Sequence, residues 1–400
     1  MIYLAGALGF LVALLVSVML HEGGHFLTAR RYGMKATQFF VGFGPTLFSR
    51  RRGETEYGVK AIPAGGFVKI VGMTPLEELE PGDEERAFYR QPARRKVVVL
   101  AAGSTMHFVI AVVLVVGATF ALGTVVERSP SVGAVSCVVP TLQDTCAPDA
   151  PASPAQVAGL QAGDRIVSID GRPVDDVRDF QTAVRSGAGR ALTVTVERDG
   201  ARRDLPVTPV TTSRPSLTAP DVTEQVGAVG VQLAANFGTQ RQGPVDSLQA
   251  SGAVMKQFAV GIKTTVTEKL GTVTQLYSAD RDPQGLVGIV GAGRISGEVL
   301  ASTETAGVKA LTFVLIVASL NLFVGLFNLL PLLPLDGGHI AIVLYESARD
   351  KVRRLRGYRG PLQRVDYNKL LPLTYGVAGT FLVLTLFILG ADLVNPIRIT

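Results

Sequence analysis

Long apolar runs alternate with polar stretches along the chain, and four of the runs are long enough to cross a bilayer. They cover about 2–26, 97–126, 308–345 and 371–394. The first run is not expected to be a cleaved signal peptide, because it lacks a basic start and a small-x-small cleavage site. The pattern therefore predicts a four-span helical membrane protein.

The stretch between the first two runs has a different pattern. Short apolar segments alternate there with Gly and Pro turns, which predicts β-hairpins at roughly 38–48, 56–62 and 66–71. Strands beside a membrane site offer an edge that can pair with an unwound peptide, whereas a simple connector sheet fits the same composition. The sequence alone leaves both interpretations open.

A soluble pattern follows the second run. Ser153–Ile166 reads SPAQVAGLQAGDRI, and Ile169–Val174 reads IDGRPV, with a helical stretch over 177–186 and a strand over 192–198. The combined motif resembles a bacterial PDZ domain, a fold that binds an added peptide strand and captures chain ends.

The region between this domain and the third run is less regular. The stretch Val254–Gln275 predicts an amphipathic helix, and Gln284–Ala301 is mildly apolar and rich in glycine. Such a segment lies on the outer membrane surface or serves as a linker, and the sequence permits either.

Charge fixes the expected topology. Basic residues cluster in two short loops, Arg30–Lys96 and Arg349–Lys369, and the positive-inside rule places both in the cytoplasm. The two termini and the stretch 127–307 are then outside. Because many of the basic residues lie in these two loops, the net charge of +6 is no evidence for nucleic-acid binding.

The only two cysteines, Cys137 and Cys146, lie in the outer segment. An oxidising compartment permits a disulfide between them, and two free thiols are the alternative. In this topology neither thiol reaches a site near the cytoplasmic leaflet.

The first run ends in His21-Glu22-Gly23-Gly24-His25, an HExxH motif. Residues i and i+4 share a helix face, so both imidazoles can bind one Zn²⁺ ion. The intervening Glu22 can take a proton from water at the open metal position. A metal motif at the end of a spanning run predicts a membrane metalloprotease.

The third run contains a candidate third ligand, Asp336, followed by Gly337 and Gly338. A carboxylate in such an apolar run is costly and needs a partner, and two His with one carboxylate form a catalytic zinc set. The alternative is a loop residue just past the membrane end. Spans one and three run in the same direction, so the HExxH motif and Asp336 are both expected near the cytoplasmic leaflet.

The second run contains one ionisable residue, His107. An ionisable group within a span indicates either a functional site or a hydrogen bond between helices. The sequence does not decide between these two interpretations.

Together, HExxH, a PDZ-like domain between spans two and three, and NxxPxxxxDG at 328–337 resemble the site-2 protease family of intramembrane zinc metalloproteases. The single PDZ domain resembles that of the actinobacterial regulators of sigma-factor proteolysis. The resemblance implies His21 and His25 as zinc ligands, Asp336 as the third ligand and Glu22 as base. It implies that Asn328 lies near the substrate backbone or oxyanion.

One motif departs from the family pattern. Many members have GPxxNF in span two, and this chain has Gly103–Phe108, GSTMHF, in which His107 replaces the Asn. His107 either keeps a hydrogen-bonding role beside the substrate or approaches the zinc ion.

The expected fold is a multi-span α-helical membrane protein with a membrane-associated β-hairpin region and an inserted extracytoplasmic PDZ (α+β) domain. The expected segments are the first transmembrane helix with HExxH (1–30), the cytoplasmic-side β-hairpin loop (31–96), the second transmembrane helix (97–126), the PDZ domain (127–210), an extracytoplasmic linker with amphipathic helices (211–307), the third transmembrane segment with NxxPxxxxDG (308–345), the basic cytoplasmic loop (346–370) and the fourth transmembrane helix (371–395).

The expected function is regulated intramembrane proteolysis in the inner (plasma) membrane. The substrates would be single-span membrane proteins, such as anti-sigma factors already trimmed outside, with zinc as cofactor, the bilayer as surroundings and no nucleic acid. Two alternatives remain from the sequence: a membrane-anchored metalloprotease whose site faces the cytosol, and an inactive membrane scaffold that recruits partners through its PDZ domain.

Overall fold

The structure is a computed structural model of the 400-residue chain, and it divides into two compact units. The described residues are 1–73, 77, 79–139, 146–147, 150–217, 222–278, 281–282, 285–360 and 364–397. The first unit, here the helical unit, comprises Met1–Gly123, Arg241–Thr303 and Lys309–Thr400. The second, here the sheet unit, comprises Thr124–Gln240 and Glu304–Val308.

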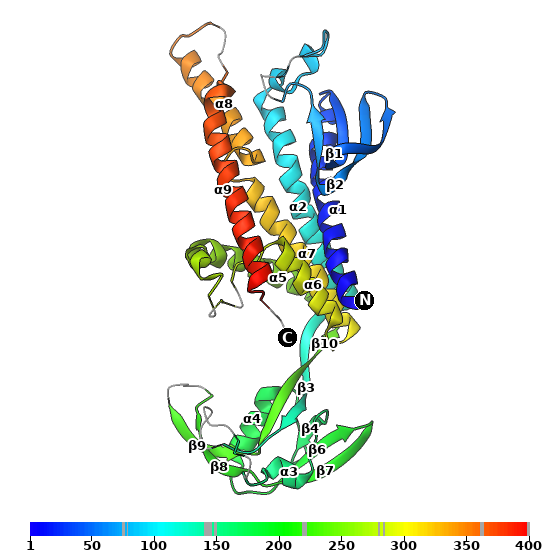
Figure 1. Ribbon diagram of the computed structural model, residues 1–400, viewed down its shortest axis with the longest axis vertical. Coiled ribbons are helices and arrows are strands. Elements are labelled where there is room, and N and C mark those ends of the chain that lie inside the picture. The colour runs from blue at the N-terminus through cyan, green and yellow to red at the C-terminus, as the bar shows by residue number, and fades with distance from the viewer. Residues whose placement is uncertain are drawn as a thin grey trace. The chain divides into compact units, whose positions relative to one another are not determined.

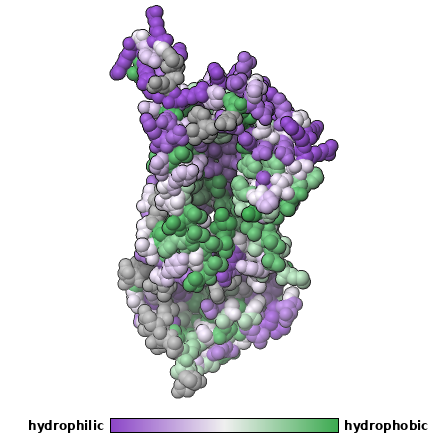
Figure 2. Space-filling view, turned by 45° about the horizontal axis from the view of Figure 1, so that its top comes forward, coloured by the Kyte–Doolittle hydropathy of each residue, from purple (hydrophilic) through white to green (hydrophobic). Residues whose placement is uncertain are grey.

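Within the described residues, four helices are long and apolar enough to cross a membrane, as the hydrophobic pattern predicted. They are α1 (Ile2–Arg31), α2 (Ala93–Leu122), α7 (Ala306–Asn328) and α9 (Tyr367–Val394) (Figure 1). Large apolar side chains such as Leu8, Val12 and Leu386 point outward from them. Figure 2 shows hydrophobic residues gathered below a hydrophilic cap. Lipid would cover such a surface, because water does not solvate it favourably.

The expected third segment, 308–345, is divided in the structure. Helix α7 ends at Asn328, and α8 (Asp336–Leu355) begins after a turn over 329–335. Pro331 and Pro334 lack the backbone N–H that a continuing helix needs, which explains the break. The segment expected over 308–345 therefore consists of two helices, with Asp336 at the start of the second.

The stretch after α1 forms two long antiparallel strands, β1 (Ala36–Arg52) and β2 (Thr55–Ile70). The sequence suggested three shorter strands, and the structure joins the second and third into β2. Phe39 pairs with Tyr57 on one side and with Val68 on the other, so the first half of β1 lies between the two halves of β2. One edge of the bent sheet is consequently formed by the end of β2.

The remaining helices of this unit include two in the region expected to hold amphipathic helices, α5 (Pro244–Thr264) and α6 (Ile289–Ala301). Helix α6 lies against α1, where a Cβ on Gly6 would come within 2.6 Å of the Ser296 carbonyl oxygen. Short helical turns occur at Glu84–Arg86, Phe88–Arg90, Thr265–Lys269 and Leu270–Gln275.

The sheet unit combines antiparallel strands with two helices. Its main sheet has the order β10-β3-β4-β6-β7, β5 pairs with β4, and β8 and β9 form a separate hairpin. The elements are β3 (Thr124–Val135), α3 (Pro154–Ala158), β4 (Arg165–Ile169), β5 (Arg172–Pro173), α4 (Val177–Ser186), β6 (Leu192–Arg198), β7 (Ala201–Val207), β8 (Val210–Pro215), β9 (Thr223–Ala228) and β10 (Val231–Gln240).

This unit extends beyond the boundary at 210 that the sequence suggested. Strand β10 pairs with β3 from Val231–Val135 to Gln240–Thr124, so the chain returns to complete the sheet. The core is apolar and includes Ile166, Phe180 and Val196. The expected linker over 211–307 therefore begins with three strands of the folded unit.

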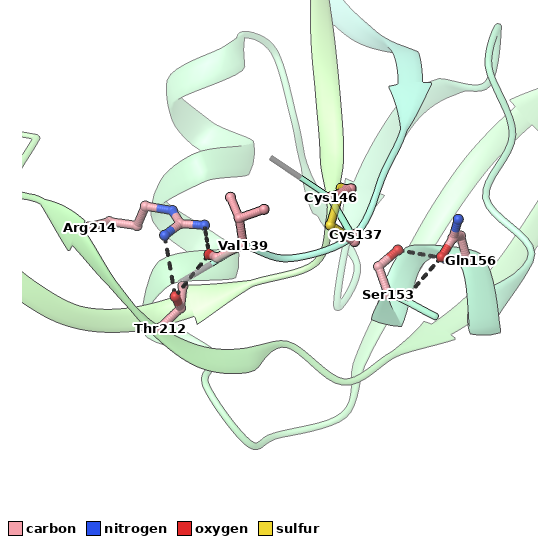
Figure 3. Close-up of a disulfide and its surroundings, with 7 residues drawn as sticks. All are labelled: Cys137, Val139, Cys146, Ser153, Gln156, Thr212 and Arg214. Carbon is pink, nitrogen blue, oxygen red and sulfur yellow. Dashed lines mark hydrogen bonds between the residues drawn. A yellow bond between two sulfur atoms is a disulfide. The ribbon is translucent and has the colours of Figure 1, made fainter. Parts of the chain in front are cut away.

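A groove of about 650 Å³ lies between α4, residues 136–139 and the β8–β9 hairpin. Its wall at 136–139 is held in two ways (Figure 3). Cys137 and Cys146 form a disulfide, so the free-thiol alternative is excluded in this structure. The guanidinium of Arg214 donates a hydrogen bond of 2.8 Å to the carbonyl oxygen of Val139.

Candidate metal centre

The HExxH motif occupies the last third of α1, with His21 and His25 one helical turn apart and both buried. The Nδ1 atom of His25 lies 2.8 Å from the carbonyl oxygen of Val99 on α2. A carbonyl oxygen only accepts, so Nδ1 carries the proton and Nε2 keeps its lone pair. Helix α2 thus orients one ring for binding a metal.

Asp336 reaches the same place from the first turn of α8. Its Oδ2 atom lies 3.4 Å from Nε2 of His21 and 3.4 Å from Nε2 of His25. The two residues after it must be glycine, because a Cβ on Gly337 would overlap the carbonyl group of Leu329 and one on Gly338 would come within 2.6 Å of the Leu332 carbonyl carbon. Close packing of the α8 start on the preceding turn therefore positions the carboxylate.

The three donor atoms fit a zinc ion. Ligand atoms around a tetrahedral zinc ion with bonds of about 2.0–2.2 Å lie about 3.3–3.6 Å from one another. The observed separations are 3.1 Å between the two Nε2 atoms and 3.4 Å from each to Asp336 Oδ2. Asp336 Oδ2 is buried without a hydrogen-bond partner among the described residues. A metal ion at this place would bind the unpaired oxygen.

Gly103 of α2 lies directly against the two imidazoles. A Cβ at this position would come within 2.5 Å of His21 Cε1 and 2.7 Å of His21 Nε2, and it would overlap His25 Nε2. Only glycine lets α2 approach the rings so closely. The space in front of the donor atoms therefore depends on a residue without a side chain.

Glu22 lies between the metal-binding face and the β-sheet. The backbone N–H of Val68, at the edge formed by the end of β2, donates a hydrogen bond of 3.1 Å to Glu22 Oε2. This bond fixes one oxygen of the carboxylate and leaves the other for a proton-transfer role. The sheet edge and the HExxH motif are thus directly connected.

The two remaining predicted site residues differ in their placement. His107 lies one turn after Gly103 on α2, and its ring centroid is 4.9 Å from that of His21. Asn328 is the last residue of α7, and its amide makes no hydrogen bond with the described residues. The structure brings His107 to the centre, and among the described residues it gives Asn328 no hydrogen bond to the other predicted site residues.

The sequence interpretation missed a residue, Asn321, whose Oδ1 lies 2.8 Å from His107 Nδ1. An uncharged polar residue within an apolar run was the available signal, since buried polar groups in spans require partners. His339 lies within the first turn of α8, and its ring stacks with that of Tyr367 at a centroid distance of 6.2 Å.

Comparisons with known proteins agree with this chemistry. The model of peptidase family M50 matches residues 9–361. The chain is 39% identical to zinc metalloprotease Rip1 of Mycobacterium tuberculosis over 414 residues, covering all of both chains. It is likewise 39% identical over 414 residues to zinc metalloprotease Rip1 of Mycolicibacterium smegmatis, again with complete coverage of both.

Proposed function

The chain belongs to peptidase family M50, the site-2 type of zinc metalloprotease, and from this membership we propose that it cuts its substrates within the membrane. The proposed reaction is hydrolysis of a peptide bond in the spanning segment of a single-span membrane protein. The proposed substrate class is anti-sigma factors that another protease has already trimmed outside the membrane, as part of regulated intramembrane proteolysis.

One observation supports this proposal above the others. The donor atoms of His21, His25 and Asp336 lie close together. Both histidines belong to α1, a helix that is apolar enough to cross a bilayer. A protease of the cytosol has no need to build its metal centre on such a helix. An inactive scaffold would leave the intact donor set and its unpaired carboxylate oxygen unexplained.

We assign His21, His25 and Asp336 as the zinc ligands and Glu22 as the catalytic base. When bound, zinc supplies a Lewis acid that polarises the scissile carbonyl and activates water. Glu22 takes the proton of the attacking water and delivers it to the leaving amine nitrogen. The bond from Val68 holds the Glu22 carboxylate in place for both transfers.

The edge strand is the proposed site for the unwound peptide. A transmembrane helix shields its carbonyl groups in internal hydrogen bonds, so the substrate must unwind before attack. The end of β2 lies beside Glu22, and a strand edge offers backbone groups that satisfy an extended peptide. Such pairing would keep the released peptide groups hydrogen-bonded beside the metal ligands.

For the sheet unit we propose a PDZ domain outside the cytoplasm, together with both chain termini. The groove between α4 and residues 136–139 suits an added peptide strand. The disulfide between Cys137 and Cys146 suits an oxidising compartment. The basic loops at 31–96 and 346–370 support the same orientation through the positive-inside rule.

The proposal is tested with the full chain reconstituted in lipid together with a trimmed single-span substrate. Mass spectrometry of the products should place the cut inside the apolar segment of the substrate, and Glu22→Gln should produce none. A cut in the polar flank would contradict intramembrane cleavage and favour a site that faces the cytosol.

A further inference from the structure

A buried polar network joins three of the spanning helices beside the metal centre. The Asn321 side chain on α7 lies between His107 of α2 and Ser17 of α1, and all three residues are at most 3% exposed. His107 Nδ1 is 2.8 Å from Asn321 Oδ1, and Asn321 Nδ2 is 3.0 Å from Ser17 Oγ. Uncharged polar groups within spans need such partners, but this network also contacts the site.

The orientation of the Asn321 amide follows from its other contacts. Its Nδ2 lies 2.8 Å from the carbonyl oxygen of Val317, which can only accept a hydrogen bond. Ser17 Oγ donates its own proton to the carbonyl oxygen of Ala13, so it too accepts from Nδ2. A flipped amide would place its oxygen against Val317 O, and the atom facing His107 must therefore be Oδ1.

The protonation of His107 follows in turn. Because Asn321 Oδ1 accepts, Nδ1 of His107 carries a proton. Burial of the ring disfavours a second proton, so Nε2 is left with its lone pair. The ring packs against His21, one turn along α2 from the glycine that touches both metal-binding imidazoles. A neutral hydrogen-bond acceptor is thereby presented beside the metal centre.

His107 is not part of the ligand cluster itself. Among the described residues, the group whose ligand atoms lie within 4.8 Å of one another is His21, His25 and Asp336. His107 is close to this group but outside it. Its Nε2 is therefore not part of the metal site, which leaves this atom for a molecule that lies next to the ligands.

We propose that His107 binds the substrate by accepting a hydrogen bond from one of its backbone N–H groups, and that Asn321 is the positioning residue that fixes His107 as an acceptor. The inference rests on the proposed function, because unwinding a spanning helix releases N–H groups that are costly to leave unpaired in an apolar site. A peptide N–H is a donor, and this tautomer of His107 offers it the matching lone pair.

The first test reads the tautomer directly and needs no substrate. The chain has four histidines, so selective ¹⁵N labelling of the zinc-loaded full chain in lipid nanodiscs gives a small set of side-chain signals. Besides the metal-binding ring of His25, which is also protonated at Nδ1, we expect a neutral, metal-free ring protonated at Nδ1 that disappears in His107→Asn. In Asn321→Leu this ring should change to the Nε2-protonated form, while the His339 ring, assigned from His339→Gln, stays the same. An Nε2-protonated His107 in the unaltered chain, or no change in Asn321→Leu, overturns the inference.

The second test separates substrate binding from chemistry. His107→Leu and Asn321→Leu should keep one zinc ion per chain and raise KM for the spanning substrate about tenfold to a hundredfold, with a smaller change in kcat. His107→Asn should recover part of the loss, because an amide oxygen can also accept. Thr105→Val on the exposed face of α2 is the matched control.

Two outcomes of the second test overturn the inference. If zinc content falls together with activity, His107 stabilises the metal site. If kcat falls at constant KM, His107 acts in the chemical step and not in substrate binding. If the unaltered chain cleaves no spanning segment, the proposed function fails, whereas the tautomer measurement still decides whether Asn321 positions His107.

Discussion

The carboxylate of Glu22 accepts a hydrogen bond from the backbone N–H of Val68, so the helix that holds the metal-binding histidines is tied to the edge of the β-sheet. The two residues come from neighbouring segments that the sequence presents as a span and a loop. Their contact places the proposed base between the metal ligands and the strand edge proposed to hold the substrate. The hydrogen bond between Val68 and Glu22 therefore links the proposed base to the proposed substrate-binding edge.

Glu22→Gln should abolish cleavage while zinc remains bound. The amide oxygen still accepts from Val68, but it cannot take a proton from water, and loss of a general base costs about 10²- to 10⁴-fold in rate. Zinc content and cleavage are measured on the same preparation, with Glu84→Gln in an exposed turn as the control. Cleavage near the unaltered rate would exclude Glu22 as the base.

Asp336→Ala should lower zinc affinity by more than the roughly 10- to 100-fold typical of losing a group that only supports a ligand. Asp336→Asn should weaken binding less, because an amide oxygen is a poorer donor than a carboxylate yet occupies the same place. Competition with a zinc chelator measures both variants. Full occupancy in Asp336→Ala would mean that the third ligand lies elsewhere, and His107 would be examined next.

Gly103→Ala should disrupt the metal centre without removing any donor atom. The added methyl group would lie within 2.7 Å of His21 Nε2, so either the rings or α2 must move. Gly117→Ala on the same helix is the matched control, because a Cβ there has no atom within 4 Å. We expect zinc and activity to be lost only in Gly103→Ala, and equal behaviour of the two variants would contradict the close packing.

The sequence predicted the parts of the site that side-chain identity and spacing encode. HExxH needs only one turn of helix, and Asp336 is visible as a carboxylate in an apolar run. The supporting contacts from Val99 and Val68 were not predictable, because backbone groups leave no signature in the residue type. Asn321 was missed because a single amide in a span has no spacing pattern to mark its partner.

The end of the sheet unit was missed for a different reason. Strand β10 is bounded by Gly230 and by Gly243-Pro244, but its partner β3 lies far away in the chain. Pairing between distant strands depends on the complete sheet and not on local pattern. The helices, by contrast, were predicted well because length and hydropathy alone define a membrane span.

Asp164 should stabilise the sheet unit in a pH-dependent manner. Burial alone would raise the pKa of this carboxyl group, but hydrogen bonds from the Arg198 guanidinium and the Gln161 N–H lower it below its usual value. The stabilisation is therefore present above about pH 4, near the pKa of an unfolded Asp, and is lost as the pH falls through the folded pKa.

Asp164→Asn should remove this dependence and destabilise the unit by about 3 kcal/mol, since it leaves the Arg198 guanidinium without its charged partner. Amide hydrogen exchange of β4 and β6 in the full chain, at neutral and acidic pH, measures the free energy of opening. Arg165→Gln is the control, because its ion pair with Glu197 is exposed and worth about 0–1 kcal/mol. Equal effects of both variants would contradict the assignment.

The sheet unit should act as a filter for substrates and not as part of the catalyst. The proposed ligands and base all lie in the helical unit, and the sheet unit has its own apolar core. Its removal is best made at 124–240, because a deletion ending at 210 would leave β10 without the strand it pairs with. A flexible linker in its place should leave zinc content unchanged.

The decisive measurement compares trimmed and untrimmed forms of one substrate with both versions of the enzyme. If the unit excludes bulky outer domains, the deletion should permit cleavage of the untrimmed form, which the intact chain ignores. If it delivers the substrate, cleavage of the trimmed form should slow instead, because the local concentration supplied by the groove is lost. Equal selectivity of both enzymes would show that the unit sets no size limit, and any filter would then lie in α5, α6 or the spanning helices themselves.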